Sequence, residues 1–244
     1  MARQRLICFP WAGGGPSAFR DWSRALRSET EVWGVCLPAH EGRVAEPPAT
    51  DLVDAADKVA AALRSMMTVP IVLFGHSLGA WLGLEVARRM EASSMPVRHL
   101  VVSGRRAPSV PAAVMERFGD LPDAVLLETI RSVYGGIPDN VWSQPEIMEA
   151  ILPALRGDLT MLESYRYRPG SKLACPITVM GGDADPHTSP SGWLESWKAE
   201  TDSTFQIRRL AGGHFFIETE RAEVLQIIDA VLNQKHGRSW GPVA

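Results

Sequence analysis

One short segment constrains this chain more than any other: an apolar run that passes through a small-residue turn into a helical pattern. Residues 70–74 read PIVLF, residues 75–79 read GHSLG, and residues 78–90 read LGAWLGLEVARRM. A continuous apolar run such as PIVLF is typical of a central strand covered on both faces. A strand, then G-x-S-x-G, then a helix is the context in which a serine serves as a nucleophile. The segment therefore predicts that Ser77 is a catalytic nucleophile, the alternative being a structural Gly-Ser turn.

Steric constraints explain why glycines lie on both sides of Ser77 in this turn. A tight strand-to-helix turn holds the serine backbone in a strained conformation, so the residues two places before and after it must be small. Gly75 and Gly79 meet that requirement, and Ala80 lets the helix pack closely. The helix that follows Ser77 also directs free N–H groups and the positive end of its dipole toward the serine. We therefore expect the N–H of Leu78 to belong to an oxyanion hole.

A serine hydroxyl is a weak nucleophile at neutral pH, so a base is required. His214 lies in LAGGHFFIE, after the last expected strand and before the final helix. His76 adjoins Ser77, where the turn is expected to direct its ring away from the hydroxyl, and His99 opens an expected strand. We therefore predict His214 as the general base, the alternative being a loop histidine that is hydrogen-bonded for structure. The remaining histidines are His40, His187 and His236.

The third catalytic group is expected on the loop after the next-to-last strand. Residues 177–187 read ITVMGGDADPH, which offers Asp183 and Asp185. A carboxylate there would orient the imidazole ring and stabilise its protonated form. We favour Asp185, because the turn that begins at Gly182 can direct it back toward His214, whereas Asp183 is placed to cap the turn. The chain order serine, aspartate, histidine is that of the α/β-hydrolase fold.

The stretch CFPWAGGGPSAF, residues 8–19, follows the first expected strand and allows two interpretations. Its glycines fit the loose G-x-G-x-x-A pattern of a dinucleotide loop. Such a loop should be followed about 20 residues later by an acid at the tip of the second strand. That strand, VWGVCLP, instead ends in Pro38. We therefore interpret the stretch as an oxyanion loop, with the N–H of Ala12 as donor and Trp11 as the near alternative.

Short β-type runs alternate with helical patterns along most of the chain, which favours an α/β fold with a mostly parallel central sheet flanked by helices. The expected strands are Leu6–Phe9, Val32–Leu37, Val69–Phe74, His99–Ser103, Ile177–Met180 and Phe205–Leu210. The expected core helices are Asp51–Met67, Leu78–Met90, Ser191–Glu200 and Glu220–Lys235. In the last helix an apolar stripe is expected to face the core: Val224, Ile227, Ile228, Val231 and Leu232.

One region, residues 105–168, has no convincing strand and instead contains two amphipathic segments, Asp123–Tyr134 and Glu146–Tyr165. A long insertion with helices of its own is typical of a lid. A helical insertion without a gating role is the alternative. All 244 residues are expected to form a single α/β-hydrolase domain, its core at about residues 1–104 and 169–236. The apolar faces expected on the lid helices are Ile130 with Val133, and Ile147 with Ile151 and Leu155.

Composition excludes some classes of partner. The net charge is −3 with no polybasic block, which gives no support for nucleic-acid binding. No apolar run approaches the roughly 18 residues of a membrane span, and the N-terminal apolar run is too short for a signal peptide. We therefore expect a cytoplasmic protein that does not bind membranes. Three widely spaced cysteines favour buried or half-buried thiols: Cys8, Cys36 and Cys175.

Five motifs in order along the chain resemble those of the type II thioesterases, the stand-alone editing α/β-hydrolases of nonribosomal peptide and polyketide synthesis. They are FPWAGG at residues 9–14, GHSLGA at 75–80, SGRRAP at 103–108, GDADP at 182–186 and GGHFF at 212–216. The chain departs from the family at LPAHEGR, residues 37–43, where the family usually has L-P-G-R-x-x-R. Ala39 and His40 replace the Gly-Arg pair, so a role of this loop in carrier or pantetheine contact is not carried over.

The resemblance implies hydrolysis of acyl groups from the phosphopantetheine arm of an acyl or peptidyl carrier protein, which removes aberrant acyl units from a stalled synthase. Such a hydrolase needs no metal and no cofactor, and we expect a monomer. A fatty-acyl thioesterase or a carboxylesterase of the same fold is the alternative. A catalytically silent binding protein is a third possibility, disfavoured by the complete set of candidate residues. Arg105 and Arg106 are candidates for contact with an acidic carrier surface, the alternative being a solvated charge pair.

Overall fold

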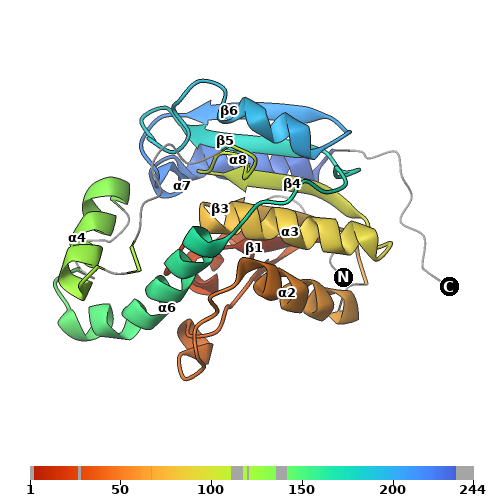
Figure 1. Ribbon diagram of the computed structural model, residues 1–244. Coiled ribbons are helices and arrows are strands. Elements are labelled where there is room, and N and C mark those ends of the chain that lie inside the picture. The colour runs from red at the N-terminus through yellow and green to blue at the C-terminus, as the bar shows by residue number, and fades with distance from the viewer. Residues whose placement is uncertain are drawn as a thin grey trace.

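Six parallel strands form the centre of the computed structural model, which describes residues 3–26, 29–66, 68–110, 118–119, 121–135 and 142–234. The strands form one sheet in the order β2-β1-β3-β4-β5-β6 (Figure 1). They are β1 (Gln4–Phe9), β2 (Thr30–Gly34), β3 (Ile71–His76), β4 (Val97–Ser103), β5 (Ile177–Gly182) and β6 (Phe205–Leu210). Every neighbouring pair is parallel. The predicted α/β fold with a parallel sheet is confirmed.

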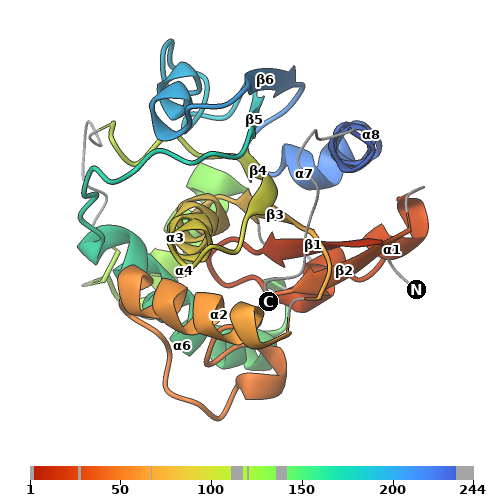
Figure 2. The same ribbon diagram turned by 90° about the vertical axis from the view of Figure 1, so that its right-hand side faces the viewer.

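Helices cover both faces of the sheet. The core helices are α1 (Trp22–Ala25), α2 (Leu52–Met66), α3 (Leu78–Ala92), α7 (Phe216–Thr219) and α8 (Arg221–Leu232), with short 3-10 helices η1 (Pro16–Phe19) and η2 (Glu41–Arg43). Figure 2 shows α2 and α3 on one face and α1 and α8 on the other. Alternation along β3 explains why both faces are covered. Ile71 and Leu73 pack into the cluster of α2 and α3, whereas Val72 and Phe74 pack into that of α1 and α8.

The expected strands are all present, with differences only at their ends. β2 stops at Gly34 rather than Leu37, although the N–H of Val35 still donates to the Cys8 carbonyl at 2.8 Å. β3 runs to His76 and so ends directly at Ser77. Pattern reading therefore located the end of the central strand that carries the candidate nucleophile to within two residues.

The expected helix Ser191–Glu200 is wrong in its first half. Gly192 adopts a φ of +85°, outside the helical region, and only Glu195–Glu200 form a regular segment, the 3-10 helix η3. The final helix α8 matches its prediction, since its buried face includes Val224, Ile228, Val231 and Leu232, with Ile227 partly buried. Met67, Lys235 and residues 236–244, which include His236, lie outside the described residues.

Between β4 and β5 the described residues contain two helices and no strand, as expected: α4 (Asp123–Tyr134) and α6 (Pro145–Ser164). They lie to one side of the sheet, and α6 runs from the region of α4 back toward α3 (Figure 1). The predicted apolar faces are partly wrong, because Val133 and Ile147 are 37% and 39% exposed. Ile130 and Leu155 of the predicted faces are buried as expected, in an apolar cluster with Phe118, Leu126, Leu127, Met148 and Leu159.

The cysteine prediction is confirmed. Cys8 and Cys175 are buried, Cys36 is half-buried, and all three are free thiols. Burial raises the pKa of the Cys8 thiol well above its usual range, so this side chain acts as a small apolar core residue. Across the described residues, none of the helices combines the length and the apolar composition that crossing a membrane requires.

Candidate active site

Ser77 lies in the turn between β3 and α3, and its backbone is strained. Its φ of 54° and ψ of −114° define a conformation that L-residues rarely adopt. A Cβ added at Gly75 would lie 2.0 Å from the Gly79 carbonyl oxygen, and one added at Gly79 would lie 2.1 Å from the Phe9 carbonyl oxygen. A side chain at either glycine would force the strand, the turn and the helix apart. The steric interpretation of G-x-S-x-G therefore holds in the structure.

Asp185 and His214 lie on the loops that follow β5 and β6, and the parallel sheet brings these loops together. Asp185 Oδ2 accepts a hydrogen bond from His214 Nδ1 at 2.9 Å, and both side chains are buried. Burial raises the pKa of Asp185, but the bonds from His214 and from the His187 N–H outweigh it and hold the pKa below its ordinary value. Asp183 instead accepts the Gly212 N–H at 2.9 Å and so connects the two loops. The structure thus separates the two candidate acids as expected.

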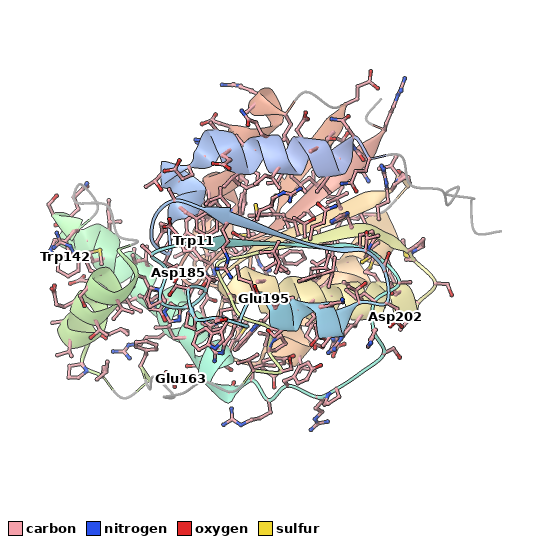
Figure 3. All side chains as sticks on the ribbon, turned by 90° about the horizontal axis from the view of Figure 1, so that it is seen from above. Trp11, Trp142, Glu163, Asp185, Glu195 and Asp202 are labelled. Carbon is pink, nitrogen blue, oxygen red and sulfur yellow. The ribbon has the colours of Figure 1, made fainter. Side chains whose placement is uncertain are left out.

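A cavity of about 690 Å³ lies over the carboxyl ends of the strands and is lined by both Ser77 and His214. Among the described residues no hydrogen bond joins these two side chains, which is common in an active site without substrate. Figure 3 shows Asp185 and Trp11 near the end of the sheet that faces α4. The opposite wall of the cavity comes from α4 and α6 and is apolar: Ile130, Tyr134, Ile147, Ile151, Leu155 and Leu159.

The other histidines near the site, buried His76 and half-buried His187, have structural surroundings. His76 lies beneath His214, with ring centroids 5.1 Å apart, and its Nδ1 bonds Ser103 Oγ at 2.9 Å. Burial holds the pKa of His76 well below its ordinary value. The His187 ring stacks on Tyr134 at 4.7 Å, and burial together with the charge of Arg105 lowers its pKa to about 4. Both rings therefore stay neutral near pH 7. His99, as expected, makes a structural contact in the sheet, with Thr178.

The N-terminal loop presents its backbone to the cavity. The Gly13 N–H donates to Asp158 Oδ2 at 2.8 Å and the Gly14 N–H to the Trp11 carbonyl at 2.9 Å, so neither is free for a ligand. In the described part of the chain, the N–H groups of Ala12 and Leu78 donate no hydrogen bond. Leu78 is the first residue of α3, whose N–H has no partner within the helix. The described residues thus offer two N–H groups without a hydrogen bond, one from the loop that lines the cavity with Ser77 and one from the residue after Ser77, the kind of donors from which an oxyanion hole is built.

Sequence reasoning missed a second buried acid at this loop. Asp158 on α6 also contacts His40 Nε2 at 3.0 Å, and both side chains are buried. The available signal was the spacing, since Leu155, Asp158 and Leu162 fall on one face of the helix and that face is otherwise apolar. Ala39, beside His40, has a φ of +68°. The chain therefore keeps a glycine-like backbone at the position where the sequence departs from the resembled family.

Neither interpretation of the paired arginines at the end of β4 is correct. Arg105 and Arg106 are 7% and 6% exposed, so they form neither a solvated charge pair nor a carrier-binding surface. The Arg105 guanidinium lies 4.3 Å from the centre of the Trp81 ring, and that of Arg106 lies 5.3 Å from the centre of Trp193. Tryptophan faces stabilise desolvated guanidinium groups, so this pair packs as part of the core beneath the site.

The parallel sheet, the strained serine after its central strand and the buried Asp–His contact together define an α/β-hydrolase enzyme. A family model of the thioesterase domain matches residues 4–232. The chain is 37% identical over 229 residues to the gramicidin S biosynthesis protein GrsT of Aneurinibacillus migulanus, covering 93% of this chain and 88% of that protein. It is 35% identical over 223 residues to thioesterase PikA5 of Streptomyces venezuelae, covering 90% and 78%.

The structure is similar to that of the type II thioesterase BorB from the borrelidin biosynthetic cluster. The TM-score is 0.87 at 36% sequence identity, covering 94% of this chain and 93% of BorB. The chain belongs to the thioesterase family, among the type II thioesterases of nonribosomal peptide and polyketide biosynthesis. It is therefore a hydrolase of thioesters.

Proposed function

We propose that this thioesterase hydrolyses acyl groups from the phosphopantetheine arm of acyl or peptidyl carrier proteins and so removes aberrant units from a synthase. Ser77 is the nucleophile, His214 the general base and Asp185 the group that orients it. The observation that carries the proposal is the buried 2.9 Å contact between Asp185 Oδ2 and His214 Nδ1, beside a cavity that Ser77 also lines. A carboxylate on Nδ1 leaves Nε2 as the basic nitrogen of the ring.

The first half of the reaction transfers the acyl group to the enzyme. His214 Nε2 takes the proton of the Ser77 hydroxyl as the oxygen attacks the thioester carbonyl. The carbonyl oxygen becomes negative and accepts hydrogen bonds from the N–H groups of Ala12 and Leu78. Each such donor contributes about 3–4 kcal/mol to the stability of the transition state. The carbon–sulfur bond then breaks, and the protonated His214 gives its proton to the departing pantetheine thiolate.

The second half returns the enzyme to its starting state. His214 takes a proton from water, and the resulting hydroxide attacks the acyl-Ser77 ester at the same carbonyl. The oxyanion again bonds the N–H groups of Ala12 and Leu78, and the carboxylic acid leaves as Ser77 regains its proton. Asp185, with its lowered pKa, stays ionised and stabilises the positive ring that forms in both halves. The protein groups named here supply every proton transfer.

The acyl chain is proposed to occupy the cavity between the sheet and the pair α4 and α6. Its far wall is apolar, which suits a hydrocarbon chain, and α4 and α6 act as a lid on a core formed by the rest of the chain. The Tyr134 ring at the end of α4 supports this role, because it stacks on His187 and meets the His214 ring edge-on at 5.0 Å. The lid is thus in contact with the proposed base.

The proposal is tested by the rate on three substrates that share one acyl group. These are the acyl-carrier protein, the acyl thioester of free pantetheine and an acyl ester of a simple alcohol. We expect kcat/KM to be highest on the carrier protein and lowest on the ester. Equal values on the ester and the carrier would contradict a carrier-directed function and favour a general esterase. Electrospray mass measurement of the carrier protein reports loss of the acyl group directly.

A further inference from the structure

Asp158 is an acid in a place where an isolated charge is costly. It lies on α6 between the apolar residues Leu155 and Leu159 and is 2% exposed. Its Oδ2 atom accepts the Gly13 N–H at 2.8 Å and contacts His40 Nε2 at 3.0 Å. A buried carboxylate is tolerated when its oxygens are hydrogen-bonded and its charge is paired. Here both contacts are made by Oδ2, with groups from two other segments of the chain.

The ring of His40 has no nitrogen free for catalysis. Its Nδ1 lies 3.0 Å from the Pro38 carbonyl oxygen, which only accepts, so Nδ1 carries a proton. Its Nε2 faces Asp158 Oδ2, which also accepts the Gly13 N–H. All three contacts are satisfied when one proton lies between Nε2 and Oδ2. Burial lowers the pKa of His40, but the bond with Asp158 and its negative charge outweigh burial and raise it. Burial also raises the pKa of Asp158, so both shifts favour keeping a proton between Nε2 and Oδ2.

The contact with Gly13 reaches the proposed oxyanion hole. Gly13 directly follows Ala12, and the Gly14 N–H bonds back to the Trp11 carbonyl at 2.9 Å. The peptide units on the carboxyl side of Ala12 are therefore held at two points, one within the loop and one on α6. The φ of Gly13 is +76°, and a Cβ there would lie 3.3 Å from Leu155 Cδ1, so α6 also packs closely on this loop.

We infer that Asp158 and His40 are positioning residues that hold the Gly13 peptide and thereby aim the Ala12 N–H at the carbonyl oxygen under attack. The inference rests on the proposed function of Ser77 and Ala12. An oxyanion hole acts on the transition state and not on the bound thioester, so its misalignment lowers kcat and leaves KM nearly unchanged. A role in packing alone would lower the free energy of unfolding without a selective fall in kcat at unchanged KM.

Asp158→Leu tests the inference, because leucine has the same branched heavy-atom skeleton but accepts no hydrogen bond. With an acyl-pantetheine thioester we expect kcat to fall about 10- to 100-fold, within the effect of one oxyanion donor, and KM to change less than about 3-fold. A trifluoromethyl ketone analogue, which forms an oxyanion on adding to Ser77, should lose affinity by the same factor as kcat. The control is Asp123→Asn, which weakens the bond that Asp123 accepts from Arg156. Arg156 lies on α6 two residues before Asp158, and we expect this variant to leave kcat and the affinity for the analogue unchanged.

Asp158→Asn serves if the leucine variant fails to fold, since it keeps the shape of the side chain. At the position of Oδ2 an amide offers either an acceptor to Gly13 or a donor to His40, but not both. We expect kcat to fall at least about 3-fold with KM unchanged, because misaligning one oxyanion donor part-way costs part of its contribution. An unchanged kcat, or a rise in KM alone, would overturn the inference. A wild-type enzyme that hydrolyses no thioester would instead overturn the proposed function.

Discussion

Asp185 and His214 are joined by a hydrogen bond of 2.9 Å, whereas Asp183, two residues earlier, bonds the backbone of Gly212. We therefore expect Asp185→Asn to lower kcat by about three to four orders of magnitude, because an amide no longer holds the productive tautomer of the ring. Asp183→Asn should cost less than about 10-fold, since an amide oxygen still accepts the Gly212 N–H. Steady-state rates on one thioester measure both. A larger loss in Asp183→Asn would move the role to that residue.

The strain at Ser77 predicts that catalysis and stability are opposed at this position. Ser77→Gly should abolish hydrolysis and raise the free energy of unfolding by about 1 kcal/mol relative to Ser77→Ala, since glycine accepts a φ of 54° without strain. Ser77→Ala is the matched control, because it also lacks the hydroxyl but keeps the restricted backbone. Urea unfolding of the two variants gives the difference. Full activity in either variant would exclude Ser77 as the nucleophile, and equal stability would exclude the strain.

His187 predicts a loss of stability in acid. Burial, with the charge of Arg105, lowers its pKa from 6.5 to about 4, so the unfolded chain binds this proton more readily than the folded one. Its contribution is therefore present above pH 6.5 and is lost as the pH falls toward 4, by an amount of about 3 kcal/mol. His187→Phe keeps a ring stacked on Tyr134 but does not titrate, so its free energy of unfolding should fall less over this range. Urea unfolding at pH 7, 5.5 and 4.5 tests this, and identical pH profiles would contradict it.

The position of Ala150 predicts that substitution there changes KM in a way that depends on acyl-chain length. It lies on α6 and lines the cavity. A larger side chain there should displace the end of a long acyl chain, and excluding about two methylene groups costs about 1.4–1.6 kcal/mol, or about tenfold in affinity. We expect Ala150→Phe to raise KM about tenfold for a dodecanoyl thioester and to leave that for an acetyl thioester unchanged. Glu149→Phe, on the neighbouring exposed residue, is the control. An equal rise for both substrates would argue against this acyl site.

The elements that sequence reasoning recovered depend on local rules. The continuous apolar run of β3, the stripe of α8 and the glycines around Ser77 are visible within windows of a few residues, and each forms as expected. The errors arose where a neighbouring segment decided the outcome. Val133 and Ile147 are apolar at helical spacing, yet α4 and α6 meet through other residues and leave these two exposed. The burial of Arg105 and Arg106 likewise depends on tryptophans from α3 and from the region before η3.

The sequence by itself determined the parallel α/β fold, the turn that carries Ser77 and the order of the candidate site residues, because steric and periodic constraints act between near neighbours. The sequence favoured Asp185 over Asp183, but only the tertiary structure placed Asp185 against His214, because the two aspartates have the same side chain and lie two residues apart on one loop. The tertiary structure also formed the pair of His40 and Asp158, which lie 118 residues apart. That contact exists because α6 packs over the loop that follows β1, and no local pattern encodes where two distant segments will pack.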